Sequence, residues 1–245
     1  MQLIRAAADM PPTSSPTSPN HDARPLATGP RLVVLHYTGM ATAAAAVARL
    51  CDPEARVSAH YVIDEDGTLL ALVPEARRAW HAGVAGWGDI DDVNGHSIGI
   101  EIVNPGHDWG YRAFPQRQIA AVIELATAIV ERYQLPAAAV IGHSDVAPAR
   151  KIDPGEFFPW DRLAAHGLGV WPDRTEPSDV DPAAAFDALA RIGYRFDLPN
   201  TEPAHVVAAF QRHWRRTSVD GRLDRETMGL VTGVARLCDS GDQPT

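Results

Sequence analysis

Residues 137–155 read AAAVIGHSDVAPARKIDPG, and this stretch decides where the fold places its site. Its first five residues are apolar and predict a short strand that ends at Gly142. His143 follows directly, at a strand end where side chains converge on a ligand. The prolines farther along exclude regular pairing, so the loop can fold back and carry Asp153 toward His143. An imidazole, a cation and a carboxylate on one such loop are typical of a metal-centred hydrolytic site.

Outside this stretch, apolar patterns predict strands and helices in alternation. Strands are expected at residues 31–35, 58–63, 68–73 and 97–103, and the middle two form a hairpin. Helices are expected at 42–50 and 116–133, where alanine is frequent or apolar residues recur with helical spacing. These elements predict an α/β (α+β) fold with a central mixed β-sheet flanked by helices.

The composition changes after residue 168. Residues 171–179 are rich in proline and acidic residues, as interdomain linkers are. Beyond them the pattern predicts helices at 182–192, 202–214 and 224–237. The sequence therefore predicts four parts: a flexible or surface-wrapping leader at 1–28, a catalytic domain at 29–168, a linker at 169–181 and a small all-α domain at 182–240.

The charge and composition exclude several classes of protein. The chain has 245 residues and a net charge of -9, which disfavours nucleic acid as a partner. No segment approaches the run of about 20 apolar residues that a membrane helix needs. Two cysteines, Cys51 and Cys238, are most simply free thiols. We also expect the protein to be a monomer.

The beginning of the chain bears on location. Residues 1–30 contain no apolar stretch long enough for the core of a signal peptide. This predicts a cytoplasmic protein. A periplasmic or envelope location is the alternative, if the native chain carries a leader that is not present here.

Two histidines and one carboxylate form the expected metal site. A catalytic zinc usually takes three protein ligands and leaves its fourth position for water. His36 and His143 each follow an apolar strand, and their imidazoles meet at one edge if those strands are neighbours in the sheet. With Asp153 from the loop they make a complete set of zinc ligands. Asp145 in the same loop receives no chemical role.

Glu101 lies in the apolar sequence SIGIEIVN at residues 97–104, where a carboxylate is costly to bury without a partner. A salt bridge to an arginine is one explanation, and a general base beside the metal is the other. Lys151, two residues before Asp153, is the candidate that acts together with Glu101. An ammonium group at this position can stabilise the oxyanion of a tetrahedral intermediate.

Two further histidines lie near the predicted sheet. His60 falls within a strand pattern, and a structural role is favoured over metal binding. His81 follows Trp80 and precedes a flexible Ala-Gly pair, so it either lines a cleft or is a capped loop histidine. We count both His81 and Trp80 as candidate substrate contacts.

The motifs together resemble the type 2 N-acetylmuramoyl-L-alanine amidase family. The resemblance covers about residues 30–165 and rests on the sequences LHYT at 35–38, VSAHYVI at 57–63, AWHAG at 79–83, SIGIE at 97–101 and the loop at 143–153. It implies that His36, His143 and Asp153 bind Zn²⁺, that Glu101 is the general base and that Lys151 stabilises the oxyanion. The implied reaction is hydrolysis of the amide between N-acetylmuramic (or 1,6-anhydro-N-acetylmuramic) acid and L-alanine in peptidoglycan or muropeptides.

Two details refine this resemblance. Some phage-type relatives use a tyrosine where this chain has Ala59, which favours Glu101 as the base here. A third ligand that is Asp rather than Cys is similar to the bacterial branch for murein recycling and murein turnover. In the related branch the position of Arg150 lies close to the carboxylates of the peptide stem, so Arg150 is a candidate substrate contact, with a solvent-facing arginine as the alternative.

The C-terminal residues resemble a three-helix peptidoglycan-binding domain. The resemblance rests on FQRHW at 210–214 and on VDGRLDRET at 219–227, although ordinary turn and capping rules explain part of it. The alternative is a structural appendage packed on the catalytic domain. For the whole protein, a binder that does not cut peptidoglycan and a zinc peptidase acting within the stem are the competing hypotheses.

Overall fold

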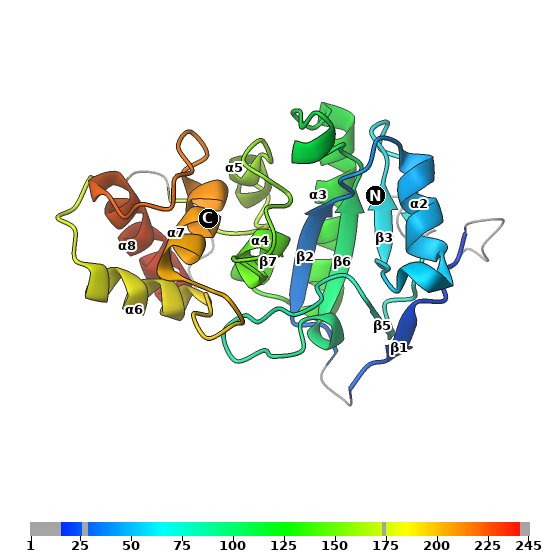
Figure 1. Cartoon of the computed structure of the whole chain (residues 1–245), viewed down its shortest axis with the longest axis horizontal. Coiled ribbons are helices and arrows are strands. Elements are labelled where there is room, and N and C mark those ends of the chain that lie inside the picture. The colour runs from blue at the N-terminus through cyan, green and yellow to red at the C-terminus, as the bar shows by residue number, and fades with distance from the viewer. Residues whose placement is uncertain (1–15, 26–28, 173–174, 241–245) are drawn as a thin grey trace.

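The computed structural model describes residues 16–25, 29–172 and 175–240. A five-stranded mixed sheet with the order β4-β3-β6-β2-β7 lies in the middle of the molecule (Figure 1). Neighbouring strands are parallel except for β4, which pairs antiparallel with β3 at one edge. The strands are β2 Leu32–Tyr37, β3 Tyr61–Ile63, β4 Leu69–Ala71, β6 Ser97–Ile102 and β7 Val140–Gly142. This arrangement confirms the predicted fold class.

The helices flank this sheet and extend beyond its β7 edge (Figure 1). The α-helices are α2 Ala43–Cys51, α3 Gln116–Tyr133, α4 His143–Val146, α5 Trp160–Ala164, α6 Pro182–Ile192, α7 Pro203–Trp214 and α8 Arg225–Ser240. Single 3₁₀ turns are η1 Pro53–Ala55, η2 Asn94–His96, η3 His107–Trp109 and η4 Ala137–Ala139. Local chemistry sets several of the boundaries: the Thr42 hydroxyl caps α2, and Asp181 followed by Pro182 starts α6. The predicted helix at 116–133 is confirmed.

The two faces of the sheet have different surroundings. On one face, alternate residues of β2 and β6 pack against the apolar stripe of α3: Val33, Leu35, Ile98, Ile100, Ile102, Ile119, Val122 and Ile129. Side chains of a strand alternate between faces, so the intervening residues of the same strands point away from α3. These include His36 and Glu101, which are partners in the β2–β6 register. The α3 side is therefore core. On the opposite side Val34 packs into a second core with the C-terminal helices, whereas Glu101 lies at a cavity.

Residues 16–25, for which the sequence predicts a flexible or surface-wrapping leader, are held against the rest of the chain. Strand β1, His21–Ala23, pairs antiparallel with β5, Arg77–Ala79. Ser18 and Asn20 are buried, and the Asn20 side chain donates to the carbonyls of Asp52 and Val57. Hydrogen bonds to a distant loop order this segment, and a polar composition alone gives no sign of them. Residues 1–15 and 26–28 of the leader lie outside the described part of the chain.

Several predicted strands are shorter than expected, and two of them show a local cause. Residues 137–139 form a 3₁₀ turn after Pro136, and the strand occupies only Val140–Gly142. In the hairpin, residues 58–60 do not pair with β4 as a regular ladder, because the amide of Ser58 donates to Trp80 and that of His60 to Gly99. Tyr61 nevertheless pairs antiparallel with Ala71, so β3 and β4 form the predicted hairpin.

The C-terminal helices share a hydrophobic core with the sheet. Leu189 of α6, Phe210 of α7 and Val231 of α8 belong to the same buried cluster as Val34 and Ile141. The division into domains at the predicted boundaries stays a prediction, and the shared core gives weight to the alternative of a packed appendage. Both cysteines are free thiols. Among the residues that the structure describes, no helix is long and apolar enough to cross a membrane.

Candidate metal centre and active site

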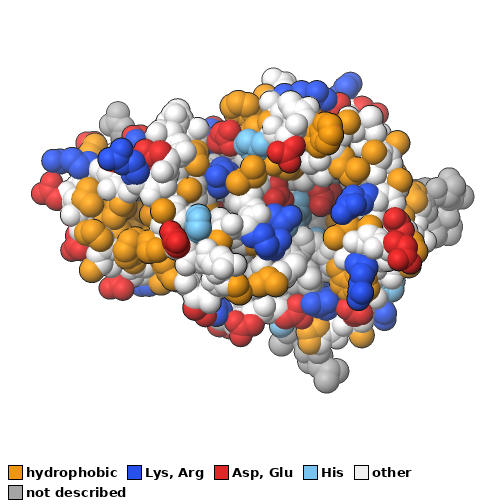
Figure 2. All heavy atoms as spheres, in the orientation of Figure 1, with side chains coloured by type: hydrophobic (Ala, Val, Ile, Leu, Met, Phe, Trp, Pro, Cys, Tyr) orange, Lys and Arg blue, Asp and Glu red, His pale blue; other side chains and the backbone are white. Residues whose placement is uncertain are grey.

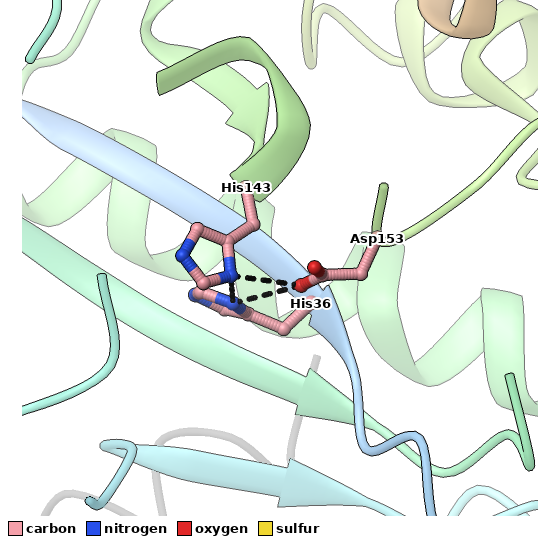
Figure 3. Close-up of side chains that lie close together, drawn as sticks. All are labelled: His36, His143 and Asp153. Atoms are coloured by element: carbon pink, nitrogen blue, oxygen red, sulfur yellow. Dashed lines mark hydrogen bonds and ion pairs between the residues drawn. The ribbon is translucent and has the colours of Figure 1, made fainter. Parts of the chain in front are cut away.

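His36, His143 and Asp153 converge at one end of the parallel strands (Figure 3). His36 lies on β2, and His143 begins α4 directly after the neighbouring strand β7. The Nδ1 atoms of the two imidazoles are 2.8 Å apart, and Asp153 Oδ2 lies 2.9 Å from Nδ1 of His143 and 3.2 Å from Nδ1 of His36. All three side chains are buried. The structure thus brings together the three residues that the sequence predicts as ligands.

The outer nitrogens of the two imidazoles determine what these inner atoms can bind. His143 Nε2 lies 3.0 Å from the carbonyl of Ala82, an acceptor, so Nε2 carries the proton and Nδ1 carries a lone pair. His36 Nε2 lies 3.0 Å from His81 Nδ1, and a proton on Nε2 again leaves Nδ1 as an acceptor. Two imidazole lone pairs and a carboxylate oxygen at such distances repel each other unless a cation lies among them. This donor set fits a metal ion, and its composition fits zinc.

The electrostatics of the site agree with that assignment. Burial, together with the charge of His143, lowers the pKa of His36 to about 4. The carboxyl group of Asp153 has a pKa far below its usual range, because its attraction to the two histidines outweighs the cost of burial. A neutral imidazole and an ionised carboxylate are the protonation states in which these groups bind metals.

His81 supports His36 from behind. Its Nδ1 accepts from His36, and its Nε2 lies 3.1 Å from the hydroxyl of Ser97, which in turn donates to the carbonyl of Val93. Both ring nitrogens are therefore used within the protein, and the side chain is buried. A histidine in this position can fix the tautomer and orientation of a metal ligand. His81 also lines a cavity over this site, so its predicted contact with substrate stays a prediction.

Three residues around His81 had no role in the sequence interpretation. The Asn94 side chain accepts from the amides of His81 and Ala82, at 3.0 and 2.8 Å, and Ser97 completes the hydrogen-bond chain. A Cβ on Gly99 would lie only 2.4 Å from the ring of His81. A glycine inside a buried strand indicates that another group approaches the backbone closely. Gly99 is such a glycine, so the sequence carried a sign of this contact.

Glu101 faces the same side of the sheet as His36, at the paired position on β6. Its Oε2 atom is buried and has no hydrogen-bond partner among the described residues, so the predicted alternative of a salt bridge to an arginine is not observed. Burial raises the pKa of Glu101 well above its ordinary value, and the negative charge of Asp153 raises it further, while Lys151 opposes both effects. A carboxylate with a raised pKa beside a metal site is suited to exchange protons.

A cavity of about 440 Å³ opens over these groups. Its wall includes Glu101, His143, Asp153 and Lys151, together with Tyr37, Trp80, Arg150 and other residues. Figure 2 shows the hollow near the middle of this face, with acidic and histidine side chains on its floor and basic side chains beside it. The predicted residues Lys151, Arg150 and Trp80 are thus all placed at the cavity.

Two of these wall residues also make contacts within the protein. The guanidinium of Arg150 donates to the carbonyls of Ala82 and Val84, and the indole of Trp80 donates to Asp22. The roles of Arg150 and Trp80 toward substrate stay predictions. His60, in contrast, accepts from the amide of Gly99 and donates to the carbonyl of Arg77, which is the structural role that the sequence favours for it.

The buried pair of histidines and the carboxylate fit a metal ion, and Glu101 lies beside them at an open polar cavity. This arrangement is typical of metal-dependent hydrolases. The model of the family described as N-acetylmuramoyl-L-alanine amidase matches residues 26–156. The chain belongs to this family. It is 36% identical over 228 residues to the N-acetylmuramoyl-L-alanine amidase AmiD of Escherichia coli K12, which covers 83% of this chain and 82% of AmiD.

Further relatives differ in how much of this chain they match. The 1,6-anhydro-N-acetylmuramyl-L-alanine amidase AmpD of Citrobacter freundii is 36% identical over 166 residues, which is 60% of this chain and 86% of AmpD. Among solved structures, E. coli AmiD in complex with the substrate anhydro-N-acetylmuramic acid-L-Ala-D-gamma-Glu-L-Lys superimposes with a TM-score of 0.75 and 35% identity, over 90% of this chain and 94% of AmiD. AmpDh3 of Pseudomonas aeruginosa, in complex with anhydromuramic pentapeptide, gives a TM-score of 0.75 at 32% identity, over 93% and 96% of the two chains.

Proposed function

We propose that this protein is a zinc-dependent amidase that hydrolyses the bond between N-acetylmuramic, or 1,6-anhydro-N-acetylmuramic, acid and the L-alanine of the peptide stem. The observation that carries the proposal is the convergence of two imidazole lone pairs and the Asp153 carboxylate within 3.2 Å. Membership of the amidase family supports the type of reaction. The geometry of the three side chains supports their position as the site of that reaction. His36, His143 and Asp153 are the proposed ligands.

The metal and the glutamate divide the chemistry between them. When bound, zinc supplies Lewis acidity, which lowers the pKa of water from about 15.7 to about 7 and polarises a carbonyl. Glu101 accepts the proton of the attacking water on its carboxylate and passes it to the nitrogen of the leaving L-alanine. Its unpaired Oε2 and its raised pKa support this role, since a carboxylate that is already hydrogen-bonded exchanges protons less readily.

The cations at the cavity are proposed to act on the substrate. The ammonium group of Lys151 stabilises the oxyanion that develops on the scissile carbonyl. A second hollow adjoins the cavity and shares Trp80, Arg150 and Lys151 with it, and Arg56 and Arg78 add positive charge to its wall. We place the carboxylates of the peptide stem there, with Arg150 as the principal contact and Trp80 against the apolar part of the stem.

Two classes of substrate are compatible with the relatives. The AmiD and AmpDh3 complexes contain anhydromuramyl peptides, and AmpD is named for the 1,6-anhydro substrate. We therefore propose anhydromuropeptide fragments as substrates and intact murein as the second possibility, to which the C-terminal helices would then bind. The cytoplasmic location stays a prediction.

Metal analysis together with mass spectrometry tests the proposal. The purified protein is expected to contain about one zinc per chain and to release free L-Ala-terminated stem peptide from a purified anhydromuropeptide. A pure binder would release no peptide, and a stem peptidase would give a different cleavage mass. The same digest on intact sacculi compares the two substrate classes. Absence of both metal and product would refute the proposal.

A further inference from the structure

Asp145 is a fully buried carboxylate that the proposed chemistry does not use. It lies on α4, two residues after the ligand His143. Its Oδ1 accepts from the hydroxyl of Tyr194 at 2.5 Å, and its Oδ2 lies 2.8 Å from His213 Nδ1 and accepts from the amide of Gly142 at 2.8 Å. Both side-chain partners come from the C-terminal region, Tyr194 just after α6 and His213 on α7. A buried carboxylate in the catalytic part is thus satisfied by C-terminal side chains.

His213 is held tightly in this position. Its ring stacks on Trp160 at 3.8 Å between centroids and on Trp214 at 3.6 Å. Its Nε2 is buried without a hydrogen-bond partner among the described residues, so the contact to Asp145 is the polar interaction that orients the ring. Leaving one buried nitrogen unpaired is unfavourable, and aromatic stacking on both faces offsets it.

The α4 turn transmits this constraint to two of the proposed ligands. His143 begins the turn, and the amide of Ser144 donates to the carbonyl of Asp153 at 2.8 Å. On the other side of Asp145, the carbonyl of Val146 accepts from the amide of Gly86. A Cβ on Gly142 would lie 2.9 Å from Pro154 and 3.2 Å from Asp145, so this corner is closely packed. Any shift of Asp145 therefore displaces His143 and Asp153 as well.

We propose that Tyr194 and His213 are positioning residues of the metal site: by holding Asp145 they set the geometry of His143 and Asp153. The inference rests on the proposed function, since it assumes that these ligands bind a metal. It gives the C-terminal helices a role that is independent of any binding to glycan.

A cobalt titration of the metal-free full-length chain tests the inference without recourse to activity. Tyr194→Phe removes one hydroxyl and keeps the ring, and His213→Phe keeps a stacking ring and removes the Nδ1 donor. Indirect partners of metal ligands typically change metal affinity by about 10- to 100-fold. We expect the double variant to bind Co²⁺ about tenfold more weakly than wild type, and its visible absorption bands to change, because those bands report ligand geometry.

Val231→Ala is the matched control, since Val231 is buried in the same C-terminal core but does not contact Asp145. It should lower the thermal midpoint without changing Co²⁺ affinity or the absorption bands. If the Tyr194 and His213 variants unfold more easily yet bind Co²⁺ within about twofold of wild type and keep unchanged absorption bands, the positioning role is wrong while the proposed function stands. If wild type itself binds no Co²⁺, the proposed function fails and the inference fails with it. Should the double variant not fold, the single variants decide by the same criteria.

Discussion

His36 and Glu101 occupy paired positions on the neighbouring parallel strands β2 and β6, and both point to the face of the sheet opposite α3. This relationship places a proposed metal ligand next to a carboxylate that has no hydrogen-bond partner on its Oε2 among the described residues. Parallel strands pair in a fixed register, so the two side chains stay adjacent without a flexible loop between them. The separation of ligand and base is thus built into the sheet itself.

Replacing Glu101 by Gln should abolish most turnover and keep the metal. General acid–base catalysis contributes about 10²- to 10⁴-fold, and kcat should fall by that order. The measurement is single-turnover release of stem peptide, combined with metal analysis of the same sample. A variant that keeps full activity would remove Glu101 from the mechanism.

The same substitution should stabilise the metal-free chain at neutral pH. The folded-state pKa of Glu101 is raised, so the folded chain holds this proton more tightly than the unfolded chain does. The free energy of unfolding of the wild type therefore falls as the pH rises above the unfolded pKa of about 4.3. Gln cannot ionise, so the advantage of the variant should grow over that range. Urea unfolding at several pH values in a chelator measures the difference, and an advantage that shrinks with rising pH would contradict it.

His143→Ala should remove the metal and the activity together. The loss leaves two protein ligands where a catalytic zinc usually has three. Metal content by mass spectrometry and peptide release are the two readouts. His166→Ala is the control, because His166 is an exposed histidine whose Nδ1 contacts only a nearby carbonyl. Retention of one zinc per chain in the His143 variant would show that the ligand set is different.

His81→Asn separates a supporting role from substrate contact. If His81 orients His36 through the 3.0 Å hydrogen bond, zinc affinity should fall about 10- to 100-fold. At saturating zinc, KM should then stay close to that of the wild type. A raised KM with unchanged zinc affinity would support the substrate contact that the sequence predicts and would reject the supporting role.

Lys151→Met should lower kcat and leave zinc bound. Removing one group that stabilises an oxyanion costs about 10²- to 10³-fold in kcat. Arg49 also lines the cavity, on α2, so Arg49→Met is a control that removes a positive charge from the same wall. Equal losses in the two variants would mean that general electrostatic attraction, and no specific contact to the oxyanion, explains the effect.

Acid should destabilise the metal-free chain through His60. Burial, together with the charge of Arg24, lowers the folded-state pKa of His60 to about 3. The unfolded chain therefore binds more protons, and the free energy of unfolding falls as the pH drops from about 6.5 toward 3. His60→Gln should be less stable at neutral pH but should show a shallower loss between pH 6.5 and 4. Thermal unfolding in a chelator at several pH values measures how stability changes with pH in the wild type and in the variant. An equal pH dependence in the two proteins would exclude His60 as a contributor.

Much of the fold was accessible from local patterns. The helix at 116–133, the hairpin around β3 and β4 and the parallel strands β2 and β6 follow from the spacing of apolar residues. The ligand set was accessible as well, because His36 and His143 each lie at the end of an apolar strand and the strands β2 and β7 are neighbours. Whether the leader is flexible or held on the surface was left open by the sequence, since its polar residues bond to carbonyls more than 30 positions away.

The sequence by itself determined which chemical groups are present and on which elements they lie: two strand-end histidines, a loop aspartate, a glutamate in a buried strand and a lysine beside the ligand. Only the tertiary structure decided how each group is used. It gave His81, which lines the cavity, a hydrogen bond to His36, and it gave Asp145, which had no role in the sequence, partners at Tyr194 and His213. The physical reason is that strand and helix patterns repeat over a few residues, whereas the partners of a buried polar group are chosen by packing between segments far apart in the chain.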